Sequence, residues 1–170
     1  MRTRLTLILI AAFVLCGCRS AVYDALETFG VEKRDVLVNR VGAARNAQEA
    51  AKEQFASALE QFRSVVDVDA TDLERLYDRL NRERQRSESR AGAVRDRIDT
   101  VEQVAEDLFD EWENELEEYS NAQLRRDSQR LLNDTRQRYA TLIKAMRSAE
   151  RSMDPVLEIF QDQVLTLRKL

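Results

Sequence analysis

Apolar and small side chains recur at alternating steps of four and three residues, and this heptad pattern limits the fold more than any other feature of the sequence. On a helix, the pattern gathers these side chains into one stripe that has to be buried against a neighbouring helix. In the first long segment, about residues 31–66, the stripe comprises Leu37, Val41, Ala44, Gln48, Ala51, Phe55, Ala58, Phe62 and Val65. Because three of these nine residues are alanine, we expect a thin seam between closely spaced helices.

Capping signals divide the rest of the chain into further helices. A Thr71-x-x-Glu74 capping box predicts the start of a second helix that ends near Tyr119. Ser120 predicts the cap of a third helix, and Asp154-Pro155 predicts a restart, with Asp154 as the N-cap. The stripes comprise Leu73, Leu76, Leu80, Ala91, Val94, Ile98, Val101, Ala105, Leu108, Trp112 and Tyr119, then Leu124, Ser128, Leu131, Thr135, Tyr139, Leu142, Met146, Ala149 and Met153, and finally Val156, Phe160, Val164 and Leu167.

Two parts of this pattern leave alternatives open. Residues 81–90 carry no apolar side chain, and Ser87 takes the seam position there. This stretch is either a thin seam that faces the alanines of the first helix or a local break. The final stripe, in residues 156–170, needs a partner. We expect it to dock on the first long helix or on the short segment Ala21–Phe29, or to serve in self-association or partner binding.

The charge distribution predicts where the chain folds back. Residues 99–118 contain ten Asp or Glu and no Lys or Arg, whereas residues 122–152 contain eight Lys or Arg and three Asp or Glu. An antiparallel hairpin that turns near Ser120 would place the acidic block beside the basic one and so select register and orientation.

Composition supports the same fold class. With four glycines, one proline and 34% charged residues, the chain is better suited to long helices than to sheets. We therefore expect an all-α fold, an elongated antiparallel bundle of about three long coiled-coil-like helices after a cleaved signal peptide.

The chain contains no histidine, which removes the commonest general base and transition-metal ligand.

The N-terminus is typical of an exported lipoprotein. Arg2 and Arg4 precede an apolar run, residues 5–15, that is too short to span a bilayer. The run ends in Leu15-Cys16-Gly17-Cys18, which resembles the bacterial lipobox, in which the last cysteine is acylated. We expect residues 1–17 to be removed as a signal peptide and Cys18 to anchor the protein in the membrane. The alternatives are an uncleaved signal anchor and a buried N-terminal helix.

These expectations set the domain organisation and location. An acylated N-terminus with a short juxtamembrane segment, residues 18–30, precedes a helical bundle domain, residues 31–170. Arg19 follows the modified cysteine and favours the outer membrane, facing the periplasm, over retention in the inner membrane.

Several side-chain clusters are candidate sites, and each has a simpler interpretation. The acidic residues Glu111, Glu113, Glu115, Glu117 and Glu118 lack the turn and glycine of a calcium loop. The arginines Arg82, Arg84, Arg86, Arg90, Arg95 and Arg97 alternate with Glu83, Glu88 and Asp96. We expect solvated helix surfaces in both places, with contact to anionic lipid or cell-wall polymer as the alternative for the arginines and no nucleic-acid binding.

The only tryptophan, Trp112, lies on the predicted seam and is expected in the core rather than at a partner-binding site. We identify no catalytic residue, no metal site, no cofactor and no small-molecule substrate.

Three segments carry a family resemblance: GVEKRDVLVNRVGAARNAQEAAKEQFASALEQF, LFDEWENELEEYSNAQLRRDSQRLL and RYATLIKAMRSAERSMDPVL. They resemble the DUF2959 family of bacterial exported helical proteins or lipoproteins of unknown function, from about Ala21 to Leu167. The resemblance implies no activity or catalytic residue. It also implies a further helical segment beyond this C-terminus, so we expect the chain to be a shortened form.

The sequence thus predicts a non-enzymatic, membrane-tethered periplasmic lipoprotein that acts as a scaffold or adaptor in the cell envelope. Its expected partners are the membrane, through acyl chains on Cys18, and another envelope protein or further copies of itself. The first alternative is a protein that binds anionic lipid or cell-wall polymer. A second and more remote alternative is a hydrolase.

Overall fold

The computed structural model describes residues 33–63 and 73–169, whose regular structure is entirely helical. The helices are α3 (Lys33–Arg63), α4 (Leu73–Glu118), α5 (Ala122–Arg151) and α6 (Asp154–Arg168). The all-α prediction is therefore confirmed. The predictions for the signal peptide, Cys18, the Ala21–Phe29 segment, Val65 and the Thr71 cap lie outside the described residues.

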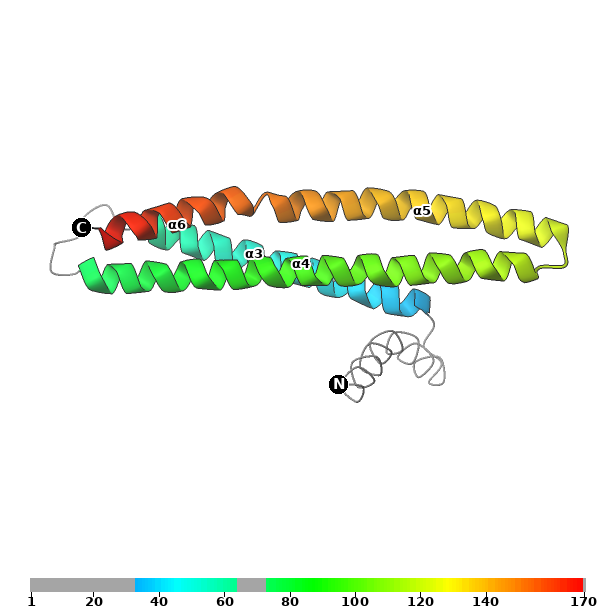
Figure 1. Ribbon diagram of the computed structural model, residues 1–170, viewed down its shortest axis with the longest axis horizontal. Helices are drawn as coiled ribbons and strands as arrows, with labels where there is room; N and C mark the ends of the chain where they lie inside the picture. Colours follow the sequence, from blue (N-terminus) through cyan, green and yellow to red (C-terminus); the bar gives the residue numbers. More distant parts are fainter. Residues whose placement is uncertain (1–32, 64–72, 170) are drawn as a thin grey trace, which may run out of the picture.

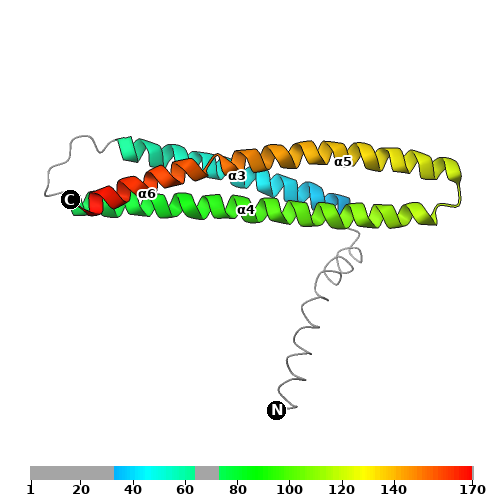
Figure 2. The ribbon, with the colours of Figure 1, turned by 45° about the horizontal axis from the view of Figure 1, so that its top comes forward.

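The helices form an elongated rod in which α4 is the longest helix and contacts each of the other three (Figure 1). The 46 residues of α4 correspond to about 70 Å of helix. Helices α3 and α5 run antiparallel to α4, and α6 continues the direction of α5 toward the start of α4 (Figures 1 and 2). This arrangement is the predicted elongated antiparallel bundle. Within the two described ranges, no helix is both long and apolar enough to cross a membrane.

The alanine seam of α3 forms as predicted. Ala44, Ala51 and Ala58 are fully buried at intervals of seven residues, because the small side chains let α4 pack closely. Ala44 and Ala51 share a cluster with Ile98 of α4 and Met146 of α5. The core is thus a thin seam of buried side chains, and this cluster contains residues of α3, α4 and α5.

Helix α4 continues without a break through the polar stretch at residues 81–90. Ser87 is fully buried, and Glu83 is 5% exposed. The carboxylate of Glu83 accepts a hydrogen bond of 2.9 Å from Gln54 of α3 and one of 2.7 Å from Arg86. The thin-seam interpretation of this stretch is correct, and the local break does not occur.

The predicted stripe of α5 is partly wrong. Leu124, Leu131 and Leu142 are 54%, 56% and 39% exposed, whereas Leu132 is fully buried with Phe109 of α4. The reason is that the face of α4 in contact with α5 is rotated relative to the predicted stripe. Near its C-terminal end, α4 turns Ala105, Phe109 and Leu116 toward α5, and the predicted Leu108 and Trp112 are only half-buried. The predicted Tyr119 lies beyond the helix and is exposed.

Both predicted caps near the ends of α5 are corrected. Asn121, not Ser120, caps the start of α5, and its side chain accepts hydrogen bonds from the backbone N–H groups of Gln123 and Leu124. At the start of α6, Met153 takes the cap position and no side chain caps the helix. Asp154 instead pairs with Arg95. The predicted restart at Pro155 is correct, because this residue lies in the first turn of α6.

Helix α6 docks within the chain, on α3 and α4. Phe160 is 1% exposed. Its ring stacks on that of Phe62, with centroids 4.4 Å apart and planes 3° apart, and contacts Phe55 at 6.1 Å. Val164 joins the same cluster with Leu76 and Leu80. Of the alternatives for the final stripe, docking on the first long helix is confirmed at Phe160, but α6 packs on α4 as well, which was not among them.

Candidate functional site

The acidic and basic blocks meet along the α4–α5 hairpin, as the sequence predicts. Arg136 pairs with Glu113 at 2.5 Å, and Arg147 pairs with Glu102 at 2.5 Å and also with Asp99. The hydrogen bond from Arg136 lowers the pKa of the Glu113 carboxyl. Because the carboxylates of these pairs lie at the surface, where water and salt screen them, the main effect of the pairs is on register.

A further ion pair joins three helices at the α5–α6 break. Arg95 of α4 donates to Glu150 of α5 at 2.8 Å and also pairs with Asp154 of α6. Glu150 is 7% exposed. The hydrogen bond to Glu150 is the largest influence that raises the pKa of the Arg95 guanidinium. Arg95 therefore ties the end of α5 and the start of α6 to α4.

The arginine run of α4 is only partly the predicted solvated surface, because Arg95 joins α4 to α5 and α6 and Glu83 is buried. Arg84 pairs with Glu88 at 2.5 Å and Arg86 with Glu83 at 2.7 Å, both along the same helix. The predicted intrahelical pairs are thus present for these two arginines. A different basic cluster, which sequence reasoning did not single out, lies at the start of α5.

This α5 cluster lines a shallow groove of about 590 Å³. Its residues are Gln123, Arg125, Arg126, Gln129 and Arg130. Arg126 donates to Gln123 at 2.7 Å, and Arg130 pairs with Asp127. The signal for it was present in the sequence as the basic block that begins at Arg125.

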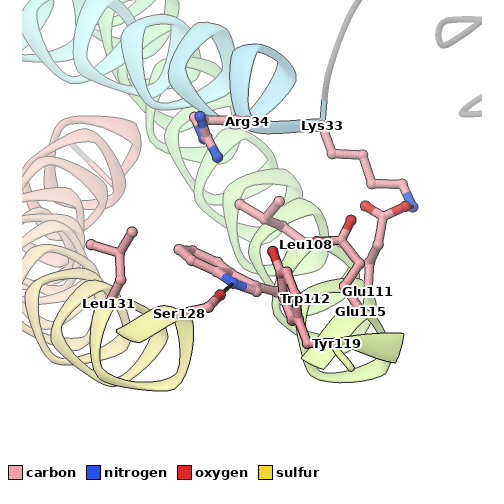
Figure 3. A pocket seen from close by; sticks show the side chains of 9 residues that line it. All are labelled: Lys33, Arg34, Leu108, Glu111, Trp112, Glu115, Tyr119, Ser128 and Leu131. Atoms are coloured by element: carbon pink, nitrogen blue, oxygen red, sulfur yellow. Dashed lines mark hydrogen bonds and ion pairs between the residues drawn. The ribbon is translucent and has the colours of Figure 1, made fainter. Parts of the chain in front are cut away.

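A second groove, here called the tip groove, lies where the α4–α5 hairpin extends past the beginning of α3. It has a volume of about 520 Å³. Helix α3 begins at its mouth, where the ammonium of Lys33 pairs with Glu111 at 2.7 Å. The lining residues are Lys33, Arg34, Leu108, Glu111, Trp112, Glu115, Tyr119, Ser128 and Leu131 (Figure 3).

Trp112 is the central side chain of the tip groove (Figure 3). Its indole Nε1–H donates to Ser128 Oγ of α5 at 2.8 Å. One part of the side chain packs against the cluster of Phe109 and Leu132, and another part lines the groove. The prediction of a core tryptophan is therefore only partly correct, because Trp112 is half-buried.

The candidate acidic residues do not converge on one another. Glu111 pairs with Lys33 and Glu113 with Arg136, whereas Leu116, between Glu115 and Glu117, is buried. In residues 33–63 and 73–169, no group of three or more Asp, Glu, His or Cys side chains is arranged to hold a metal ion.

A third groove, of about 400 Å³, lies beside the α5–α6 break. Its lining residues are Gln48, Glu49, Lys52, Phe55, Ala149, Ser152, Met153 and Val156. It is a shallow depression between α3 and the two C-terminal helices.

Of the comparisons with known proteins, the one with protein-family sequence models gives a match. Residues 22–170 match the model of a family described as protein of unknown function, DUF2959. No curated protein matches the chain, and no solved structure does.

Proposed function

The chain belongs to the DUF2959 family, and we propose that it is a membrane-tethered helical lipoprotein whose rod-shaped body serves as a scaffold or adaptor in the cell envelope. The observation that carries the proposal is the Leu15-Cys16-Gly17-Cys18 sequence, which closes an export signal a short distance before the rod begins at Lys33. Acyl chains on Cys18 would bind a charged body to the membrane without a transmembrane helix.

The shape of the body favours a role in spacing or contact over one in catalysis. A rod about 70 Å long with a thin alanine-lined core has a large surface and little enclosed volume. Exposed leucines along α5, among them Leu124 and Leu131, are suited to contact with another envelope protein. Arg19, next to the lipidated cysteine, favours the outer membrane and an orientation toward the periplasm.

The anchor is tested by metabolic labelling with a fatty acid. The unchanged chain should incorporate the label and lose residues 1–17, whereas Cys18→Ser should incorporate none and remain unprocessed. Cys16→Ser is the matched control and should be labelled normally, because the second lipobox position accepts small residues. Labelling of Cys18→Ser at the level of the unchanged chain would contradict the proposal.

The adaptor role is tested by crosslinking in intact envelopes. A photoreactive residue in place of the exposed Leu124 should capture a specific protein, whereas the same residue in place of Leu132, which is buried against α4, should not. Capture of no protein from either position would argue against an adaptor.

The basic cluster of α5 supports a second candidate, binding of anionic lipid or cell-wall polymer. Arg125 and Arg126 line an open groove in which phosphate groups would be neutralised. With a chain that begins at Arg19, and so has neither the signal peptide nor Cys18, pelleting with anionic vesicles should then exceed pelleting with neutral ones. Arg125→Ser with Arg126→Ser should remove the difference, and Arg79→Ser with Arg82→Ser on α4 should not. Equal pelleting with both kinds of vesicle would exclude this candidate.

A further inference from the structure

Two of the grooves described above lie between the same two helices. The tip groove has Arg34 of α3 and Leu131 of α5 in its walls, and the groove beside the α5–α6 break has Lys52 of α3 and Ala149 of α5. The step from one groove to the other is the same along both helices, about 18 residues or 27 Å. Since α3 and α5 run in the same direction (Figures 1 and 2) and share a core cluster, the two stretches are neighbours over this length.

Along this length, α5 exposes an apolar stripe. Steps of seven and four residues lead from Leu131 to Arg138, Leu142 and Ala149, so these side chains lie on one face of the helix. Leu131 is 56% and Leu142 39% exposed. The stripe has the spacing of a coiled-coil seam, but none of the described helices covers it.

The corresponding stripe of α3 is basic. The same steps lead from Arg34 to Val38, Arg45 and Lys52. Val38 is 65% exposed, and Lys52 pairs with Glu49 at 3.1 Å. Together with the stripe of α5, this stripe forms a surface that is here called the α3–α5 face.

The α3–α5 face has an excess of positive charge. In the part of the chain that the structure describes, three of its arginines form no ion pair: Arg34, Arg45 and Arg138. Among the acidic residues at its two ends, Glu111 and Glu49 are paired with lysines, and Glu115 belongs to α4. The face is therefore basic, although the whole chain has a net charge of −4.

We propose that the α3–α5 face binds an amphipathic helix of a partner protein. The helix would be about 18 residues long, with apolar side chains at heptad spacing and Asp or Glu along its edges. An exposed apolar stripe flanked by unpaired arginines matches such a helix in spacing and in charge. The proposal rests on the adaptor role given above and names the class of partner.

Two synthetic peptides test the charge preference. Both carry the same leucine stripe, and one is flanked by glutamates and the other by lysines. The full chain in neutral detergent should bind the glutamate peptide about tenfold more tightly, as measured by the anisotropy of a dye on the peptide. Because the chain is acidic overall, unspecific attraction favours the lysine peptide and does not produce this result.

Charge reversal locates the binding surface. Arg34→Glu with Arg45→Glu should reverse the preference between the two peptides. The matched control is Arg79→Glu with Arg82→Glu, which reverses two exposed charges of α4 and should leave the preference for the glutamate peptide in place. Far-ultraviolet circular dichroism verifies that both variants stay helical.

Three results would overturn the proposal. In the first, the unchanged chain binds the lysine peptide as tightly as the glutamate peptide, or the two double variants behave alike. In the second, Arg34→Glu with Arg45→Glu abolishes pelleting with anionic vesicles, so that the face contacts a membrane. In the third, the same variant dissociates a dimer in sedimentation, so that a second copy covers the face. An envelope protein captured through Leu124 would support the adaptor role in each case, so the two failures are distinguishable.

Discussion

Ser87 occupies a core position of α4 with its hydroxyl buried and without a hydrogen-bond partner in the part of the chain that the structure describes. The cause is the close approach of α3, whose alanines leave room for a small side chain. A neighbouring polar residue, Glu83, is buried as well, but Gln54 and Arg86 satisfy it. The polar stretch of α4 therefore contains one satisfied and one unsatisfied core residue.

Ser87→Ala should stabilise the bundle by about 1 kcal/mol or more, because it removes the desolvation cost of an unpaired hydroxyl and improves helix propensity. Ser89→Ala, two residues away on an exposed face, should gain only the propensity part, about 0.5 kcal/mol. Urea denaturation of both variants measures the difference. Equal gains would show that the buried hydroxyl has no cost.

Tyr139 links stability to alkaline pH. Its ring packs edge-on against Phe109 with centroids 5.5 Å apart, and burial raises the pKa of its hydroxyl to about 12. Since an unfolded tyrosine has a pKa of about 10, the folded state keeps the proton longer. The contribution is complete below about pH 10 and is lost as the pH rises toward about 12.

The free energy of unfolding of the unchanged chain should therefore fall between about pH 10 and 12, and Tyr139→Phe should make this fall smaller. Tyr119→Phe replaces an exposed tyrosine and should retain the full dependence. Urea denaturation across this pH range tests both, and an unchanged slope for Tyr139→Phe would refute the assignment.

Among the elements, α5 differs most from its sequence pattern. Its charges choose the correct partner and direction, as the Arg136–Glu113 and Arg147–Glu102 pairs confirm. The first half of its apolar stripe is assigned one position off, because Leu131 and Leu132 are adjacent in sequence and only the rotation of α4 decides which one is buried. In the second half, the predicted Tyr139 and Met146 do pack in the core. The seam of α3 was easier to predict, because its alanines define one close contact face.

The cap of α5 is a second case in which the sequence does not distinguish two adjacent residues. Ser120 and Asn121 are both good N-cap residues, and sequence spacing does not separate them. Asn121→Ala should destabilise the chain by about 1 kcal/mol, since its side chain accepts two backbone hydrogen bonds. Ser120→Ala should have little effect. Thermal denaturation compares the two, and the reverse order would restore Ser120 as the cap.

Helix α6 packs on α4, and its Phe160 ring also stacks on an aromatic ring of α3. Phe160→Ala should cost about 3–5 kcal/mol, because it empties a well-packed site between Phe62 and Phe55. Ile159→Ala, at a neighbouring position that is 54% exposed, should change stability by less than about 0.5 kcal/mol. A small effect of Phe160→Ala in chemical denaturation would mean that α6 contributes little to the folded body.

At the scale of the whole molecule, the heptad pattern and the charge blocks predicted the class, the elongation and the antiparallel order. They did not predict the tip groove. A groove depends on where one helix begins relative to the ends of two others, and this offset follows from the packing of α3 on α4. For this reason Trp112 was expected in the core and lies instead at its edge.

The rod itself is open to a direct test. Small-angle scattering of the non-acylated body should give a longest dimension of at least about 70 Å, from the length of α4, and a cross-section of two to three helices. A spherical particle of the same mass would contradict the bundle described here.

The position of α4 at the centre of the packing also bears on how quickly the chain folds. Its substantial helix contacts are with α3, α5 and α6, and two of these are its neighbours along the chain. Two of the three packed pairs therefore join helices that are consecutive along the chain, and helical bundles fold in microseconds to milliseconds. A chain that emerges N-terminus first meets each new helix with α3 or α4 already present. If the chain is exported in an unfolded form, as the proposed function holds, such a body would regain its structure soon after it has crossed the membrane.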